Sequence, residues 1–176
     1  MVLVENNVTA SGVTTRVYKI IDEVTHNLCT FLGFKNVHPG IIPPLTTWEQ
    51  FAEITQTLGK TFDQKHLEGW FSSSSRFEND PLTRGTFSQY QQVHNVIISG
   101  FVWHSTMMES YRQAHEKGEA LAQLLEKNKG MLHTSIDEFQ NLRVDFDFRQ
   151  FGETWLFRIE VTFDVVVTLV ETAGRV

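Results

Sequence analysis

The chain has 176 residues, 41% of them hydrophobic, which suits one domain with a core of its own. A net charge of −6 argues against a general nucleic-acid binder. The one cysteine, Cys29, excludes a disulfide framework within the chain and is expected to be a buried core thiol in a reducing compartment. The polar N-terminus lacks the pattern of a signal peptide, and no apolar run approaches the length of a membrane span.

The first expected element is a helix over about residues 14–32, where apolar residues recur at helical spacing before a glycine. Residues 34–66 follow as an insertion that Pro-Gly and Pro-Pro pairs interrupt. Thr46 and Glu49 have the spacing of a capping box, which predicts a short inserted helix that presents Trp48.

A strand is expected to start near Leu67, and the segments "SSSS" and "ENDPLTRG" then predict a projecting loop over residues 70–90. Aromatic residues on such a loop can anchor a partner protein. We interpret six residues as a partner-contact loop: Trp70, Phe71, Arg76, Phe77, Arg84 and Phe87. The alternative is that the aromatic residues cover the edge of the sheet.

The next strand is expected from about Phe87 to Trp103, and its middle is apolar on both faces, which indicates a central strand. A helix follows, with Thr106 and Glu109 at capping-box spacing. Its apolar stripe is expected to run Met107, Tyr111, Ala114, Gly118, Leu121 and Leu125. The small residues in that stripe predict close packing of the helix on a sheet.

The C-terminal part alternates between apolar and polar residues over two runs, Leu142 to Phe148 and Trp155 to Leu169, which predicts a β-hairpin turning at Gly152. One register pairs every apolar residue with another: Phe148 with Phe157, Phe146 with Ile159, Val144 with Val161 and Leu142 with Phe163. On the other face this register sets Asp147 against Arg158, a favourable pair, and Asp145 against Glu160, an unfavourable one.

The second strand of this hairpin is too long for an ordinary small globule. Residues 154–170 would span roughly 55 Å if straight, whereas a chain of this length has a radius of gyration of about 16 Å. The strand must therefore bend, contain a bulge or reach beyond its domain. Its last part, "DVVVTLV", needs a partner from this chain or from another subunit.

Together these elements predict a single α+β domain over residues 1–176. Its mainly antiparallel sheet carries the long C-terminal β-hairpin and is packed by two main helices, with the short helix inserted.

Catalytic motifs are nearly absent. His115 and Glu119 share a helix face but form only half of a metal site. The triplets "HST" at 104–106 and "HTS" at 133–135 resemble those of two-histidine phosphoesterases, although the first coincides with a helix N-cap and the second with a loop. We therefore expect no enzyme activity, no catalytic residues, no metal and no cofactor.

The order of elements resembles the tail terminator (tail completion) proteins of long-tailed bacteriophages. The resemblance covers residues 14–33 and 67–170, with the strand "VHNVIISGFVW" before a helix and the alternating strand from Trp155 to Leu169. The stretch 34–66 is longer than in compact members of that family.

The resemblance implies a structural virion protein that forms a ring, typically a hexamer, at the head-proximal end of the tail. Such a ring stops polymerisation of the tail tube and docks to the head or neck. Its expected partners are further copies of itself, the tail tube protein and the connector or neck proteins, and DNA passes through without specific binding. The expected location is the virion tail or neck, and the host cytoplasm during assembly, with no membrane.

One polar row of the hairpin is expected to line the lumen or a subunit interface: Arg143, Asp145, Asp147, Arg149, Arg158, Glu160 and Asp164. The alternative for this row is an ordinary solvated sheet face. Three other functions stay open: a neck or tail-tube protein, a two-histidine phosphoesterase, and a non-viral binding module of the same shape.

Overall fold

A computed structural model describes residues 17–39, 66–81, 88–128, 137–151 and 154–171. Its elements in chain order are α1 (Val17–Phe31), β1 (Val37–Pro39), β2 (His66–Pro81), β3 (Ser88–His104), α3 (Met107–Lys127), β4 (Glu138–Phe151) and β5 (Thr154–Glu171). The expected inserted helix around Trp48 lies outside the described residues.

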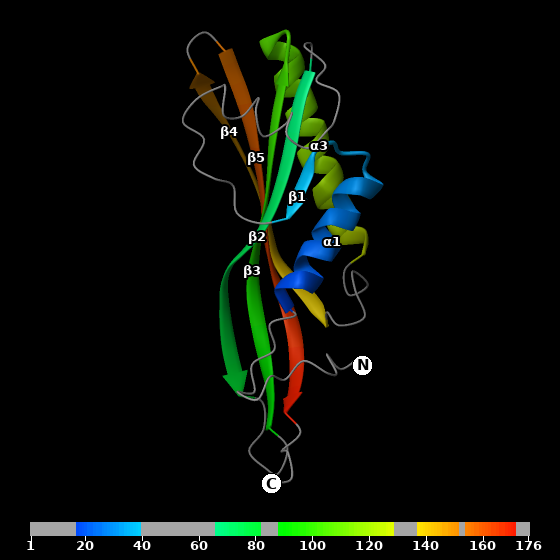
Figure 1. Ribbon diagram of the computed structural model, residues 1–176, viewed down its shortest axis with the longest axis vertical. Helices are drawn as coiled ribbons and strands as arrows, with labels where there is room; N and C mark the ends of the chain where they lie inside the picture. The colour runs from blue at the N-terminus through cyan, green and yellow to red at the C-terminus, as the bar shows by residue number, and fades with distance from the viewer. Residues whose placement is uncertain (1–16, 40–65, 82–87, 129–136, 152–153, 172–176) are drawn as a thin grey trace.

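The five strands form one sheet in the order β1-β2-β3-β5-β4 (Figure 1). β1 pairs with β2 in parallel, and every other pair is antiparallel. β3 therefore lies at the centre, as its two apolar faces predicted, and the C-terminal hairpin forms one edge. The α+β fold class is confirmed.

The register of the C-terminal hairpin is confirmed over most of its length. Phe148 pairs with Phe157, Phe146 with Ile159 and Val144 with Val161, and the charged pairs on the other face also form as expected. The register shifts between Gln140 and Arg143, where Asn141 has a left-handed φ of 57°. Two residues of β4, Asn141 and Leu142, thus oppose Phe163 in a β-bulge, so the simple pair of Leu142 with Phe163 is replaced by a kink.

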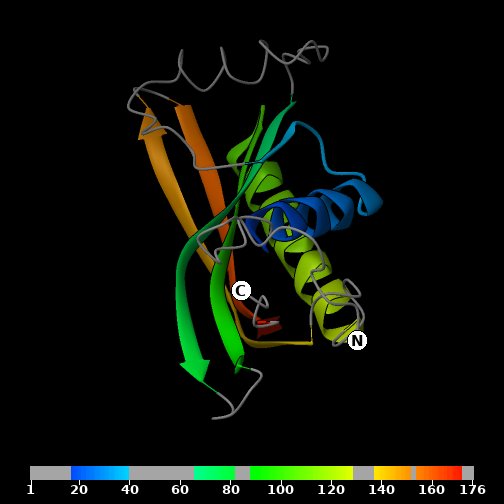
Figure 2. The ribbon, with the colours of Figure 1, turned by 60° about the horizontal axis from the view of Figure 1, so that its bottom comes forward.

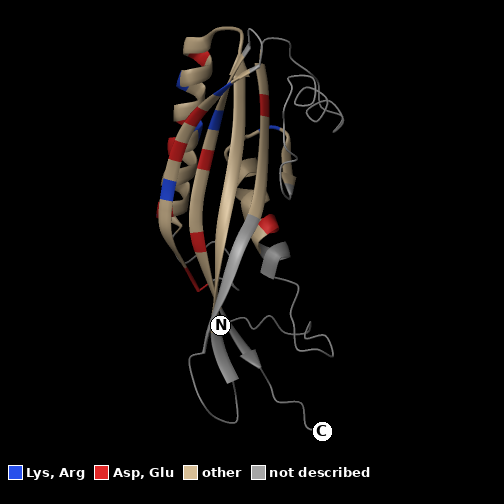
Figure 3. Cartoon of the chain, turned by 90° about the vertical axis from the view of Figure 1, so that its left-hand side faces the viewer, with Lys and Arg blue, Asp and Glu red and all other residues tan. Residues whose placement is uncertain are grey.

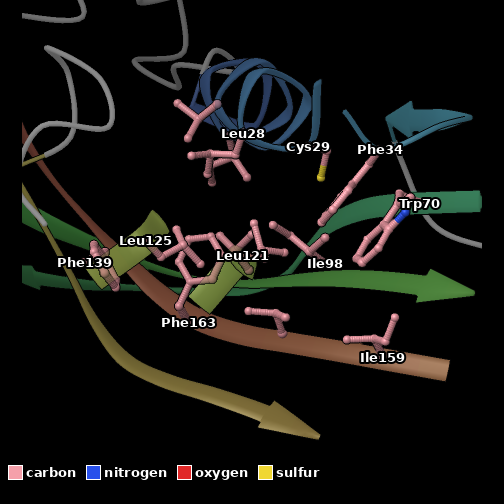
Figure 4. Packing of buried hydrophobic residues seen from close by; sticks show 14 of the residues in the cluster. Leu28, Cys29, Phe34, Trp70, Ile98, Leu121, Leu125, Phe139, Ile159 and Phe163 are labelled. Carbon is pink, nitrogen blue, oxygen red and sulfur yellow. The ribbon is translucent and has the colours of Figure 1, made fainter. Parts of the chain in front are cut away.

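Both helices pack on one face of the sheet, α3 against β3, β4 and β5 and α1 against β1 and β2 (Figures 1 and 2). The apolar rows of the strands and the helix stripes meet in one core (Figure 4). Gly118 allows a close approach of α3, since a Cβ there would lie 2.8 Å from the Phe146 ring. The predicted close packing is confirmed, and Cys29 is buried in the same core.

The helix stripes bury only part of the residues that periodicity assigned to them. Ala114, Gly118, Leu121 and Leu125 are buried in α3, whereas Met107 and Tyr111 at its start are exposed. Phe31, the last residue of α1, is also exposed. Periodicity identifies a helix face but not how far neighbouring elements extend over it, so the stripe of α3 is buried only from Ala114 onwards.

The predicted projecting loop at 70–90 is wrong over residues 70–81, which belong to β2. Backbone pairing with β3 runs through the four serines, with a shift between Ser74 and Arg76, and continues to Pro81. Serine, asparagine and aspartate have low intrinsic strand propensity, but pairing with a long apolar central strand overrides it. The short strand β1 was also missed.

The length of β5 is accommodated by extension beyond the helices. Figure 1 shows the C-terminal part of β2, the start of β3 and the end of β5 continuing as a three-stranded extension past α1 and α3. β3 pairs with β5 as far as Ser88 and Glu171, so a strand of the same chain supplies the partner that the sequence left open. β4 does not reach this extension, because its pairing with β5 begins at Glu138 and Val166.

Candidate functional site: a charged sheet face

The seven charged residues that the hairpin pattern singled out lie on one face of β4 and β5. The apolar residues that alternate with them along the strands, such as Val144 and Val161, belong to the core beneath the helices or pack against it. Because successive strand residues point to opposite faces, the charged row lies on the face away from α3. We call the row Arg143, Asp145, Asp147, Arg149, Arg158, Glu160 and Asp164 the charged face. Figure 3 shows basic and acidic positions interspersed along neighbouring strands.

The charges of this face are largely neutralised within it. Arg143 forms an ion pair with Asp145, with Nε to Oδ2 at 2.7 Å, and this contact raises the pKa of the guanidinium. Arg158 forms an ion pair with Glu160. Each carboxylate of the unfavourable cross-strand pair, Asp145 and Glu160, therefore has an arginine of its own strand beside it, which offsets their repulsion.

Asp164 connects the charged face to its neighbours on both sides. Its Oδ1 accepts a hydrogen bond of 3.0 Å from Nδ2 of Asn95 on β3. Its Oδ2 accepts one of 2.7 Å from Nδ2 of Asn141 at the bulge of β4. Asp164 thus holds the kinked edge strand to the centre of the sheet, a positional role that the sequence did not predict.

An apolar strip borders the charged face on the same side of the sheet. Its four residues alternate along their strands with residues of the helix-covered face, and all four are buried. They are Leu67 and Phe71 of β2, Phe101 of β3 and Leu156 of β5. The rings of Phe71 and Phe101 meet edge to face with centroids 6.2 Å apart. The exposed charged surface is therefore confined to the β4–β5 side of the sheet.

The predicted partner-contact loop does not exist as such in the described residues. Trp70 is fully buried in β2, stacked on Phe34 with ring centroids 4.1 Å apart, and Phe71 is buried in the strip. Their assignment as exposed loop residues is wrong. Arg76 and Phe77 belong to β2, and Arg84 and Phe87 lie outside the described residues.

A buried carboxylate on the helix-covered face is the polar cluster that sequence reasoning missed. Glu68 is 2% exposed. Its Oε1 accepts hydrogen bonds from Trp70 Nε1 at 2.6 Å and from the Lys35 backbone N–H at 3.3 Å. Its Oε2 lies 3.1 Å from Lys117 Nζ and 3.2 Å from His66 Nε2. Both oxygens are thereby satisfied, by groups from β2, α3 and the connection before β1.

The protonation of Glu68 follows from these contacts. Burial alone would raise its pKa, but the hydrogen bond from His66, the charge of Lys117 and the hydrogen bond from Trp70 together lower the pKa below its ordinary value. Lys117 also lies over the Phe34 ring, 5.0 Å from its centroid. The cluster holds α3 to β2 as a structural ion pair. The signal for it was that Glu68 and Trp70 lie two positions apart and so share one face of a strand, but the assignment of Trp70 to a loop hid this relation.

The remaining candidates for chemistry are dispersed. His115 stacks on Phe146 with ring centroids 3.9 Å apart. His104 Nδ1 lies 3.2 Å from Ser105 Oγ, and Thr106 caps α3 by accepting from the Glu109 backbone N–H. His133 lies outside the described residues. Within the described ranges, no three His, Cys, Asp or Glu side chains gather at metal-binding distance, and no helix there is long and apolar enough to span a membrane.

Comparison with solved structures finds similar chains, whereas the two other comparisons find none. No protein-family model and no curated protein matches the chain. A chain from the virion of a native gene transfer agent particle matches with a TM-score of 0.38 and 12% sequence identity, over 86% of this chain and 94% of that one. At this TM-score the overlap is too loose to establish a common fold, so it carries no functional conclusion.

Proposed function

We propose that this protein is a structural virion component that forms a ring at the head-proximal end of a phage tail, where it stops tube polymerisation and joins the tail to the head or neck. The proposal rests on the resemblance of its elements to tail terminator proteins, together with the geometry of the sheet. It assigns no chemical step to the protein.

The three-stranded extension of β2, β3 and β5 is the observation that carries the proposal. A domain that served only as a globule would gain little from strands that continue past both helices, because neither α1 nor α3 covers that part of the sheet. A protein that builds a wall with its neighbours needs such an extension, since sheets of adjacent copies can meet there.

Two edges of this extension lack a neighbouring strand among the described residues, which supplies a means of association. Beyond Val166, no described strand pairs with β5 on the side of β4. On the other edge, β1 pairs with β2 only at Trp70–Ser72, and no described strand lies beside β2 from Ser73 to Pro81. Strand edges that no other described strand pairs with favour strand-to-strand contact between copies.

The charged face suits a conduit for DNA. Its four carboxylates and three arginines leave no surplus of positive charge, and ion pairs already occupy Arg143 and Arg158. Sequence-independent DNA binding depends on cationic groups that neutralise phosphates. A lumen lined by this face would therefore let DNA pass without holding it.

The experiment is solution mass by light scattering coupled to size exclusion at several concentrations, with negative-stain images of the same fractions. A closed ring near six times 20.3 kDa supports the proposal. Long tubes would instead identify a tail-tube protein, which shares the same geometry. A monomer at every concentration that also fails to cap purified tail tubes would contradict the proposal. In that case, phosphodiesterase assays of the His104→Ala and His133→Ala variants would test the enzyme alternative.

A further inference from the structure

The large apolar side chains that stay exposed fall into two separate groups. Among the described residues they are Phe31, Met107, Met108, Tyr111 and Phe148, with exposed fractions of 78%, 54%, 76%, 48% and 53%. Phe31 stands at the end of α1, and the other four lie around the start of α3 and the outer part of β4. In Figures 1 and 2 the C-terminal end of α1 and the N-terminal end of α3 lie well apart.

The four residues at the start of α3 and on β4 form one surface, which we call the methionine–aromatic patch (Met107, Met108, Tyr111 and Phe148). The buried ring of Phe157 joins its two halves, with its centroid 5.9 Å from that of Tyr111 and 6.4 Å from that of Phe148. Met107 and Met108 precede Tyr111 by four and three positions and so neighbour it on the helix surface. Flexible methionine side chains beside aromatic rings can adapt to an inserted side chain.

Phe31 is a single projecting aromatic residue. Buried residues of α1 such as Ile21, Val24 and Leu28 face the core. The helix stops directly after Phe31, where Gly33 adopts a φ of 72° and its N–H donates to the Thr30 carbonyl. A short, well-defined helix end therefore presents Phe31, the geometry of an anchor residue in a protein interface.

The charges around the two groups are complementary. Beside the methionine–aromatic patch, Glu109 and Glu116 share one guanidinium, that of Arg112, which leaves an excess of negative charge. Four positions after Phe31, Lys35 is exposed. A contact that brings Phe31 onto the patch would also bring Lys35 towards Glu109 and Glu116. The attraction between these opposite charges would steer the approach of the two copies.

We propose that Phe31 of one copy inserts into the methionine–aromatic patch of the next copy, so that this heterologous contact closes the ring. The inference rests on the proposed ring and names its side-chain interface. A ring requires two different surfaces on each chain, since a contact between identical surfaces gives only a pair. The two apolar groups meet that requirement, with opposite charge beside each.

Paired cysteines test the contact directly. The double variant Phe31→Cys/Met108→Cys is treated with a short bismaleimide cross-linker and separated under denaturing conditions. Both positions are exposed, so the changes are not expected to disturb folding. The native Cys29 is buried, and burial raises the pKa of its thiol to about 12, so it contributes little reactive thiolate. The control, Phe31→Cys/Glu126→Cys, moves the second cysteine to the other end of α3.

The expected result is a ladder of multiples of 20.3 kDa that ends at the ring number, with no ladder from either single variant or from the control. Rings without a ladder from the double variant would overturn this inference and leave the ring proposal intact. Dimers from Phe31→Cys or Met108→Cys alone would also overturn it, because they would show an isologous contact. If the parent protein itself stays monomeric at every concentration and the double variant gives no cross-links, both the contact and ring formation by the free protein are contradicted.

Discussion

The two faces of the sheet place the same kind of side chain in opposite settings. On the helix-covered face, Glu68 is the one acidic residue buried among the described ones, and donors from three parts of the chain satisfy its two oxygens. On the charged face, Glu160 is half-buried and pairs with Arg158 of its own strand. The first carboxylate holds elements together, whereas the second contributes to a surface.

This difference has an energetic basis. Breaking a buried ion pair leaves an uncompensated charge in a medium of low polarity, which is costly. Breaking a half-buried pair at the surface, such as Arg158–Glu160, costs less because both groups keep access to water. The comparison therefore predicts that equal chemical changes on the two faces have very unequal effects on the free energy of unfolding.

The largest expected effect is that of Glu68→Gln. The substitution preserves the shape of the side chain but leaves the half-buried Lys117 ammonium without its counter-charge, so we expect a loss of about 2–4 kcal/mol in the free energy of unfolding. Urea denaturation followed by circular dichroism measures it. The double variant Glu68→Gln/Lys117→Met removes both charges and should lose less than the single variant; an equal or greater loss would contradict this account.

Packing on the same face gives the next effect. A Cβ on Gly100 of β3 would lie 2.5 Å from the fully buried Trp70 ring, so Gly100→Ala forces the ring or the strand to move. We expect a loss of about 1–3 kcal/mol, measured by the same denaturation. Adding Trp70→Phe shortens the opposing side chain, and part of the loss due to the alanine should disappear in that background. No coupling between the two changes would argue against the close contact.

His94 adds a smaller effect that depends on pH. It lies on the side of the core, and burial lowers its pKa from the ordinary 6.5 to about 4. Below pH 6.5 the unfolded chain therefore binds a proton that the folded chain does not, and stability falls as the pH drops from about 6.5 to about 4. Thermal denaturation across this range should show a shallower fall for His94→Leu. The control His26→Leu changes an exposed histidine of α1 and should keep the slope of the parent protein.

The smallest effect is expected on the charged face. Glu160→Gln is the same substitution as Glu68→Gln, but it should change the free energy of unfolding by less than about 1 kcal/mol, and less still at high salt. Denaturation at two salt concentrations measures this. A loss as large as that of Glu68→Gln would show that the charged face stabilises the monomer rather than serving as a surface.

Local patterns were sufficient where a residue and its partner lie close in sequence. The hairpin register from Val144 to Phe157 follows from alternation and a tight turn. The cap of α3 at Thr106 follows from its spacing to Glu109. The charged face also follows from alternation, because β4 and β5 pair with each other and their parity fixes which side chains share a face.

The sequence alone therefore determined the α+β class, the central position of β3, the hairpin and the set of residues on the charged face. Only the tertiary structure decided that the serine-rich segment is a strand, because its pairing with β3 outweighs weak local propensity. The tertiary structure likewise buried Glu68 and Trp70 and left Phe31 and the methionine–aromatic patch exposed. Burial depends on which elements cover a residue, and that is set by contacts between segments far apart in the chain.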